Sequence, residues 1–361
     1  MQPLTIKIIP RTLHFKRPAG TSRGVLLQRK VWYLLFRSPL LPGQFGIGEC
    51  APLPGLSPEL TPTFENELLI ATQKLEAIDS LRKIRLQEIT RHSSVLFALE
   101  TGLRQLQRHG AWQENSLFGN GKAGISINGL IWMGDYPFML KQIEEKLAAG
   151  FRCIKIKIGN IDFGQELTLL KRIRQTFSSH DIELRVDANG AFSPNEALEK
   201  LKRLSEWDIH SIEQPIAAGQ WDRTAYLVHE SPIPIALDEE LIGIQTKEEK
   251  QILLQTIKPH YIILKPSLHG GIEGCAEWIH LMQQLNDEKK MERWWITSAL
   301  ESNIGLNAIA QWTAQMKSTL PQGLGTGMLF TDNIDMPLQI RQDCLWFDPN
   351  GSFPTIETFT R

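Results

Sequence analysis

The chain has 361 residues, of which 42% are hydrophobic and 22% are charged, and its formal net charge at pH 7 is −1. This composition is typical of a globular protein long enough for one large or two medium domains. The near-neutral balance and the lack of runs of like charge argue against a nucleic-acid partner or an anionic membrane held by bulk electrostatics.

The cysteine content and the apolar runs point to a cellular compartment. Four scattered cysteines form no CxxC pair, which argues against a disulfide framework or a zinc site and favours a reducing environment. The sequence opens with no charged-then-apolar leader, and apolar runs such as Val31–Phe36 are too short to span a bilayer. We therefore expect a cytoplasmic protein with no membrane partner, and the sequence leaves its oligomeric state open.

The first third of the chain predicts an α+β domain. Thr5–Phe15 and Val25–Arg37 are rich in β-branched and aromatic residues, and the turn formers between them indicate a hairpin. Thr63–Leu75 and Ser93–Gln107 carry apolar residues at spacings of three and four, which predicts two helices. We expect this domain to cover residues 1–120.

Gly46–Leu60 is dense in glycine and proline, which excludes a regular helix or a central strand. Two interpretations remain open for it. The segment is either a plain linker or an ordered loop that covers a site, because long loops without secondary structure are often functional.

From Gly124 onward, short apolar runs alternate with amphipathic stretches. The predicted strands are Gly124–Asn128, Cys153–Lys157, Glu183–Asp187, Ser211–Glu213, Ile235–Leu237, Tyr261–Leu264 and Trp294–Thr297. The predicted helices include Pro137–Ala149, Gln165–Phe177, Pro194–Glu206, Thr246–Thr256, Ile272–Gln284 and Ile304–Gln315. Alternation with almost no hairpins implies an α/β region of parallel strands joined by helical crossovers.

Charged residues recur once per strand–helix unit. Lys157 to Asp187 is 30 residues, and the next intervals are 26 to Glu213, 25 to Asp238 and 27 to Lys265. A (β/α)8 TIM-type barrel uses roughly 31 residues per unit, and its strands end at one mouth, where such enzymes place their chemistry. A doubly wound sheet would spread the same residues along a line. We therefore predict a barrel over residues 121–329, with residues 330–361 returning to the first domain.

The strand Cys153–Lys157 carries two lysines. Since successive side chains on a strand point to opposite faces, Lys155 and Lys157 share one face and the neighbouring isoleucines share the other. The strand is either an edge strand with a solvated lysine face or part of a site that needs two cations.

Three carboxylates at consecutive strand ends would repel one another in a partly desolvated mouth. A divalent cation between Asp187, Glu213 and Asp238 removes that repulsion, and hard oxygen ligands suit Mg²⁺, with Mn²⁺ as a substitute. The alternative is three separate surface carboxylates. We predict the metal site because all three recur in consecutive units.

The lysines complete the predicted chemistry. Lys155 and Lys157 precede the carboxylate strands and Lys265 follows them, so in a barrel they stand on opposite sides of the metal. A lysine beside a cation and a second lysine is disfavoured as ammonium, so we expect a lowered lysine pKa and a general base. The natural substrate is a small-molecule carboxylate that loses the proton next to its carboxyl group, with Mg²⁺ stabilising the enediolate.

Five short motifs resemble a known family. KIK (Lys155–Lys157), VDAN (Val186–Asn189), IEQP (Ile212–Pro215), LDEE (Leu237–Glu240) and LKPS (Leu264–Ser267) are similar to the enolase superfamily, in particular its muconate-lactonizing-enzyme-like subgroup. The resemblance covers nearly the whole chain. It implies a modified (β/α)7β TIM-type barrel with an α+β capping domain built from both termini, and a loop at Gly46–Ser57 that reaches over the barrel mouth.

The resemblance also implies roles. The implied Mg²⁺ ligands are Asp187, Glu213 and Asp238, and the implied groups that orient them are Asn189 and Glu239.

Each lysine has an implied role as well. Lys157 would take the α-proton and help hydroxide leave as water, Lys265 would stabilise the enediolate, and Lys155 would support the substrate carboxylate and favour Lys157 as the base.

Within the subgroup, Thr297–Trp312 and Gly323–Phe330 most resemble the o-succinylbenzoate synthases. The implied activity is the Mg²⁺-dependent dehydration of 2-succinyl-6-hydroxy-2,4-cyclohexadiene-1-carboxylate in menaquinone biosynthesis. The residues implied to line the end of the site that holds the succinyl tail are Ser298, Glu301, Ser302 and Gly325.

Two other functions remain open. Lysines on opposite faces also suit an N-acylamino acid racemase or a dipeptide epimerase. Dipeptide epimerases of the subgroup usually carry an Asp-x-Asp at the last strand end, where this chain has GLGTG, which favours a substrate without an α-ammonium group. A non-catalytic barrel is disfavoured because folding does not require all five charged positions together.

Overall fold

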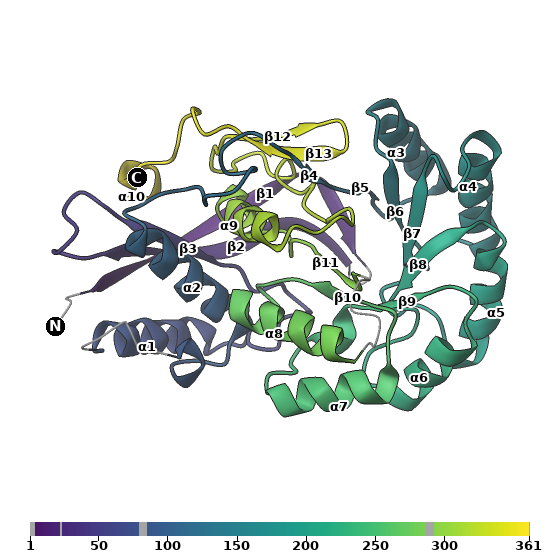
Figure 1. Ribbon diagram of the computed structural model, residues 1–361, viewed down its shortest axis with the longest axis horizontal. Helices are drawn as coiled ribbons and strands as arrows, with labels where there is room; N and C mark the ends of the chain where they lie inside the picture. Colours follow the sequence, from purple (N-terminus) through teal and green to yellow (C-terminus); the bar gives the residue numbers. More distant parts are fainter. Residues whose placement is uncertain (1–3, 22–23, 79–84, 286–291, 361) are drawn as a thin grey trace.

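The computed structural model of the protein describes residues 4–21, 24–78, 85–285 and 292–360. Figure 1 shows two parts side by side: a small sheet with two helices on the left, and a curled sheet on the right with helices around its outer side. The family resemblance predicted this division into a capping part and a barrel.

The small sheet has three antiparallel strands in the order β1 (Thr5–Thr21), β2 (Gly24–Arg37) and β3 (Gly46–Cys50). The expected hairpin is present. Its strands run further than predicted, because part of the stretch read as a turn continues β1 beyond a register shift between His14 and Ala19.

The glycine-rich segment begins with β3, which pairs with β2 at the sheet edge. Two helices accompany the sheet, α1 (Phe64–Glu76) and α2 (Ser93–Gln107), close to the predicted bounds. A Cβ placed at Gly48 would collide with the carbonyl of Ala98 in α2. The glycine therefore permits the close approach of helix and strand.

The barrel sheet has seven parallel strands in consecutive order. They are β5 (Gly129–Ile131), β6 (Cys153–Lys157), β7 (Glu183–Asp187), β8 (Ile209–Glu213), β9 (Ile235–Leu237), β10 (Tyr261–Leu264) and β11 (Trp294–Ile296). The helices that alternate with them are α3 (Tyr136–Ala148), α4 (Phe163–Thr176), α5 (Pro194–Ser205), α6 (Trp221–Glu230), α7 (Lys247–Ile257), α8 (Gly271–Gln284) and α9 (Asn303–Met316). This confirms the predicted modified TIM-type barrel.

A short segment bridges the last barrel strand and the residues just before the first one, β5. The amide of Gly323 donates to the carbonyl of Ile296 at 2.8 Å, and the amide of Gln322 donates to the carbonyl of Ser126 at 2.8 Å. These two residues thus take the place of an eighth strand. The site lies at the mouth of a ring rather than along an open edge.

One strand prediction needs correction. The expected first barrel strand, Gly124–Asn128, contributes only β4 (Ile125–Ser126), which pairs with β13 (Cys344–Phe347) in a separate three-stranded sheet. The first strand of the barrel sheet is β5, immediately after it. A pairing between positions more than 200 residues apart decides the outcome, and local pattern cannot reveal it.

The tail forms a second hairpin, β12 (Leu338–Arg341) with β13, and ends in α10 (Ile356–Thr360). Phe330 pairs with Phe15 of β1, and Phe359 lies in the same apolar cluster as Tyr33 of β2. The tail therefore packs against the N-terminal sheet.

Strand β6 shows how the sequence pattern orients the site. Ile154, Ile156 and Ile158 are buried in the largest apolar cluster. The opposite face of the strand carries Lys155 and Lys157 into the cavity at the barrel mouth. Of the two interpretations of this strand, the structure supports a site that needs two cations.

A carboxylate of the capping part caps a barrel helix. Glu100 of α2 accepts hydrogen bonds from the amides of Ile272 and Glu273, in the first turn of α8. Burial raises the pKa of Glu100 to about 8, although the two amides oppose the shift. Because the unfolded value lies near 4.3, the folded protein keeps a proton that the unfolded chain has lost between the two values.

Stability should therefore fall as the pH rises through that window. Between about pH 5 and pH 8 we expect the free energy of unfolding of the wild type to fall relative to that of Glu100→Gln by at most ~1.4 kcal/mol per pH unit, with a matching relative drop in melting temperature. Thermal unfolding at several pH values measures this, with exposed Glu248→Gln as the control. Parallel pH profiles for Glu100→Gln and the wild type would contradict it.

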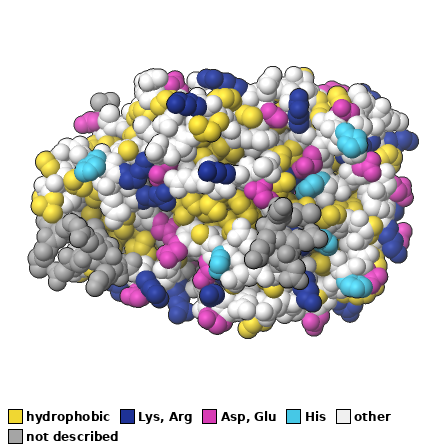
Figure 2. Space-filling model, viewed as in Figure 1, with side chains coloured by type: hydrophobic (Ala, Val, Ile, Leu, Met, Phe, Trp, Pro, Cys, Tyr) yellow, Lys and Arg dark blue, Asp and Glu magenta, His cyan; other side chains and the backbone are white. Residues whose placement is uncertain are grey.

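The surface shows mixed charge. On the face drawn in Figure 2, basic, acidic and apolar side chains are interspersed over the described part of the chain. No helix in the described ranges is long and apolar enough to cross a membrane.

Candidate active site

The carboxyl ends of the barrel strands bring the predicted charged residues together. They surround a cavity of about 420 Å³ at the barrel mouth, walled by both parts of the protein. The predicted site residues that line it are Lys155, Lys157, Asn189, Glu239, Lys265, Ser298 and Gly325. Asp187, Glu213 and Asp238 are buried, with exposed fractions of 0%, 2% and 1%.

Lys155 is the more deeply placed lysine of β6. Its Nζ lies 2.9 Å from Asp187 Oδ2 and also contacts Glu213 Oε2. The side chain is only 10% exposed, and its ammonium group pairs with two buried carboxylates.

Lys157 lies two residues nearer the strand's C-terminal end. Its Nζ lies 2.8 Å from Asp187 Oδ2 and 2.7 Å from Asn189 Oδ1. Asn189 in turn donates from Nδ2 to Glu239 Oε1 at 2.9 Å. The predicted base and both predicted orienting groups thus form one hydrogen-bonded chain along the cavity wall.

Lys265 stands on the other side of the carboxylates, at the end of β10. Its Nζ contacts Asp238 Oδ2. The lysines of β6 and β10 are therefore separated by the three carboxylate strands, β7 to β9. A substrate carbon in the cavity would have an amine available from each side.

The electrostatics differ from one expectation. Burial alone would lower the pKa of Lys155 and of Lys265, yet nearby carboxylates raise both, chiefly Asp187 for Lys155 and Asp238 for Lys265. The expectation of a lowered pKa concerned a lysine beside a bound cation, and direct contact with carboxylates has the opposite effect on these two lysines. The reason is that the carboxylates interact directly with the two ammonium groups.

The carboxylates respond in opposite directions. Burial would raise the pKa of Asp187, but Lys155 and Lys157 outweigh it and lower that pKa. Burial and the neighbouring charge of Asp187 raise the pKa of Glu213. Because the pKa values of these two neighbouring acids shift in opposite directions, the two carboxyl groups titrate as one interacting cluster.

The donor set suits a hard cation. Glu213 Oε1 and Asp238 Oδ1 are buried without a hydrogen-bond partner among the described residues, and such atoms are costly unless something satisfies them. Across the described ranges, no three His, Cys, Asp or Glu side chains are grouped as a preformed metal site. The carboxylate oxygens are the ligand type that Mg²⁺ prefers. In the structure, lysine ammonium groups contact one oxygen of each of the three carboxylates.

The four residues predicted to hold the substrate tail separate into two pairs. Ser298 and Gly325 line the cavity. Glu301 and Ser302 are fully buried and lie outside its lining. Ser302 is the N-cap of α9 and donates from its amide to Glu49 of β3 at 2.7 Å, so its partners are structural.

The glycine-rich segment also reaches the site. After β3 it continues as a loop whose residues Leu53, Pro54 and Leu56 line the cavity. Of the two interpretations left open for this segment, the ordered loop over a site is the one that the structure supports.

Sequence reasoning missed two supporting residues. Gln214 accepts from the amides of Asp238 and Glu240 at 3.3 and 3.2 Å, and His269 Nδ1 accepts from the amide of Lys265 at 2.9 Å. Gln214 also adopts a left-handed φ of 42°, a conformation that clusters at functional sites. Its position directly after Glu213 was the available signal.

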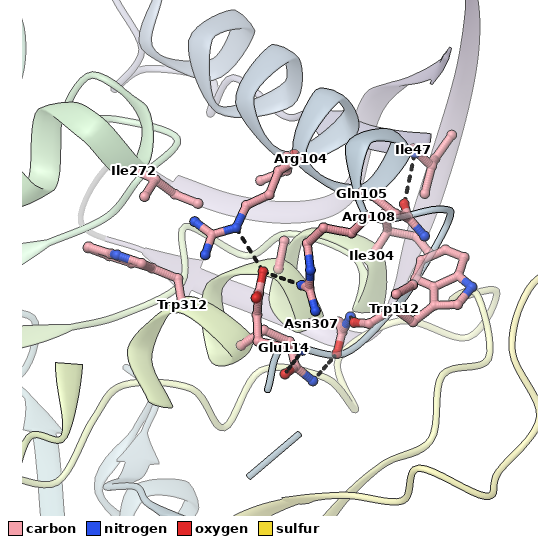
Figure 3. A pocket seen from close by; sticks show the side chains of 14 residues that line it. Ile47, Arg104, Gln105, Arg108, Trp112, Glu114, Ile272, Ile304, Asn307 and Trp312 are labelled. Atoms are coloured by element: carbon pink, nitrogen blue, oxygen red, sulfur yellow. Dashed lines mark hydrogen bonds and ion pairs between the residues drawn. The ribbon is translucent and has the colours of Figure 1, made fainter. Parts of the chain in front are cut away.

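A second, smaller cavity of about 50 Å³ lies away from this chemistry, beside α2 and α9. Figure 3 shows Arg104 and Arg108 converging on Glu114, with Asn307 close by. The Arg104 Nε to Glu114 Oε1 distance is 2.7 Å. These groups satisfy one another, so we interpret the cavity as a packing gap.

Comparisons with known proteins agree with the geometry. Residues 139–347 match the family described as Enolase C-terminal domain-like. The o-succinylbenzoate synthase of Desulfotalea psychrophila is 44% identical over 358 residues, which cover 91% of this chain and 95% of that protein. The crystal structure of MenC from Desulfotalea psychrophila LSv54 matches with a TM-score of 0.82 at 40% identity, covering 95% of this chain and 99% of the other.

A more distant neighbour shows how widely the fold is shared. The substrate-liganded L-Ala-D/L-Glu epimerase of Bacillus subtilis has a TM-score of 0.81 at 18% identity, over 96% of this chain and 97% of that one. At such identity the likeness shows the fold alone. The family match and the 44% identical relative show more, and the chain belongs to the enolase superfamily.

Proposed function

We propose that the protein is a Mg²⁺-dependent o-succinylbenzoate synthase, a lyase that dehydrates 2-succinyl-6-hydroxy-2,4-cyclohexadiene-1-carboxylate. The observation that carries the proposal is the placement of Lys157 and Lys265 on either side of a buried carboxylate cluster in one cavity. The 44% identity to a relative of that name supports the substrate.

The chain's own residues would move the proton. In its neutral form, Lys157 takes the proton from the ring carbon that bears the carboxylate, and that C–H bond breaks. The ring C–O bond then breaks, and the departing hydroxide takes the same proton from Lys157 and leaves as water. One water is lost and the ring becomes aromatic. Asp187 and Asn189 hold Lys157 for this task.

Charge develops on the substrate carboxylate as the proton leaves. Lys265, held at Asp238, would balance that charge from the opposite side of the cavity. When bound by Asp187, Glu213 and Asp238, Mg²⁺, or Mn²⁺ in its place, would supply Lewis-acid stabilisation of the same charge. Asn189 and Glu239, which are hydrogen-bonded to each other, would orient the ligands.

The second candidate is racemisation or epimerisation of an N-acylamino acid or a dipeptide, because opposed lysines can also exchange a proton from either face. Gly323, Gly325 and Thr326 line the cavity where an epimerase would need an acid for the substrate amine. That wall favours a substrate without an ammonium group.

Solvent exchange separates the two functions. We expect the protein with Mg²⁺ in D₂O to convert the cyclohexadiene carboxylate to the aromatic product at least about 100-fold faster than it exchanges the α-hydrogen of either enantiomer of an N-succinylamino acid. Mass spectrometry follows both reactions. Rapid exchange from both enantiomers without any aromatic product would replace dehydration by racemisation as the function.

A further inference from the structure

A buried guanidinium joins the two loops that wall the cavity. Arg29 of β2 is 1% exposed, although it lies on a strand of the capping sheet. One terminal nitrogen donates to the carbonyl of Ala299, and the other donates to the carbonyl of Ala51. Ala299 lies in the loop after β11, here called the barrel loop (residues 297–302), and lines the cavity. Ala51 lies at the start of the loop after β3, here called the capping loop (residues 51–57), whose residues Leu53, Pro54 and Leu56 also line the cavity.

Burying an arginine is costly, so the position requires a reason. Burial lowers the pKa of Arg29, and the charges of Glu301 and Glu49 offset part of that cost. The neighbouring Lys30 lies on the other face of the strand, where its side chain is 52% exposed. Of these two neighbouring cations, Arg29 is therefore the one that faces the interface between capping sheet and barrel.

The barrel loop held by Arg29 has an unusual backbone. Leu300 adopts a φ of 62°, which is strained for a branched side chain. The amide of Leu300 donates to Ser298 Oγ at 3.3 Å, and the amide of Ala299 donates to Glu301 Oε2 at 2.7 Å. Such a conformation persists when surrounding contacts fix it, and Arg29 supplies one from outside the loop.

The same loop connects to the strand end that carries Lys265. Glu301 Oε1 accepts a hydrogen bond from Ser267 Oγ at 2.5 Å, two residues beyond Lys265. Glu301 thus ties the loop to the barrel, and Arg29 ties it to the capping loop. The wall that contains Ser298 and Leu300 is held from both sides.

We propose that Arg29 is a positioning residue that clamps the capping loop and the barrel loop together and so sets the shape of the tail-binding end of the cavity. Arg29 touches two carbonyl groups and lies outside the cavity lining, so it acts through Ala51 and Ala299. The planar guanidinium group can donate to two carbonyl groups at once from its two terminal nitrogens, and a lysine ammonium group cannot reproduce this geometry.

Hydrogen–deuterium exchange tests the clamp without any substrate. We expect Arg29→Lys, and more strongly Arg29→Met, to raise amide exchange about tenfold or more in peptides covering 51–57 and 297–302 together. Exchange in β7 should stay at its wild-type level. The matched control is Lys30→Met, which removes the neighbouring cation together with its exposed ion pair to Glu65 and its contact over the Trp32 ring.

Kinetics test the consequence, which rests on the proposed function. With the cyclohexadiene carboxylate we expect KM of Arg29→Lys to rise about tenfold and kcat to stay within about threefold, because the lysines at the carboxylates are not moved. Arg29→Lys keeps a buried cation, so it tests the clamp even if Arg29→Met does not fold.

Two results would overturn the clamp. One is that amide exchange in both loops of the Arg29 variants equals the exchange measured for Lys30→Met. The other is a uniform rise in exchange over the whole barrel with KM unchanged and kcat lowered, which would make Arg29 a general stability residue. Failure of the wild type to dehydrate the substrate would refute the proposed function and leave the exchange result to decide the clamp.

Discussion

Lys157→Ala should abolish turnover, with a loss of at least about 1000-fold in kcat, while the fold survives. Lys157 Nζ is the group that we assign to proton removal, and its neighbours Asp187 and Asn189 orient it. Asp187 keeps a second lysine partner, Lys155, at 2.9 Å, so we expect a stability loss of only about 1 kcal/mol. Steady-state kinetics and thermal unfolding measure the two effects.

Two control variants sharpen this prediction. Lys157→Arg keeps a cation beside Asp187 but cannot give up its proton near neutral pH, so it should be as inactive as Lys157→Ala. Lys155→Ala should lose stability as well as activity, because it leaves Glu213 and Asp187 with fewer buried partners. Substantial turnover by Lys157→Ala would remove Lys157 from the role of base.

Glu213→Gln should weaken Mg²⁺ binding at least about 100-fold, since even the partners of a metal ligand typically contribute 10- to 100-fold. Glu213 Oε1 is buried without a partner among the described residues, and a bound cation would satisfy it. The glutamine side chain has nearly the same shape as the glutamate that it replaces, but it carries no negative charge to attract the metal.

Calorimetric titration of the purified protein with Mg²⁺ measures that loss. Glu199→Gln changes an exposed glutamate on α5 in the same way and should bind Mg²⁺ like the wild type. Unchanged affinity in Glu213→Gln would take Glu213 out of the proposed ligand set. Restored activity at high Mg²⁺ would support weakened binding as the cause of lost turnover.

The barrel was predictable because its signals are local. The alternation in Cys153–Lys157 matches β6 residue for residue, and it correctly places Lys155 and Lys157 on the cavity side. The even spacing of Asp187, Glu213 and Asp238 follows from one strand–helix unit repeating, so it could be read without coordinates.

The features that the sequence did not reveal depend on distant partners. Ser302 looks like a loop residue suited to bind substrate, but Glu49, 253 positions away, takes its amide and hydroxyl. Arg29 in isolation is an ordinary charged strand residue, and its role depends on carbonyls of Ala51 and Ala299 that the fold brings to it. Local pattern carries no information on such contacts.

The direction of the lysine pKa shifts also depends on contacts between distant residues. A bound cation would lower the pKa of a neighbouring lysine, whereas direct contacts with carboxylates raise the pKa of Lys155 and of Lys265. A few ångströms decide whether a lysine contacts a carboxylate or another cation, and that contact decides whether the lysine pKa rises or falls.

The most direct test of the account is an absorbance assay of the purified protein with 2-succinyl-6-hydroxy-2,4-cyclohexadiene-1-carboxylate, with added Mg²⁺ and with a chelator. We expect the diene absorbance to disappear and aromatic o-succinylbenzoate to form at an enzymatic rate only when Mg²⁺ is present. Conversion that never exceeds the uncatalysed rate, with or without the metal, would contradict the account.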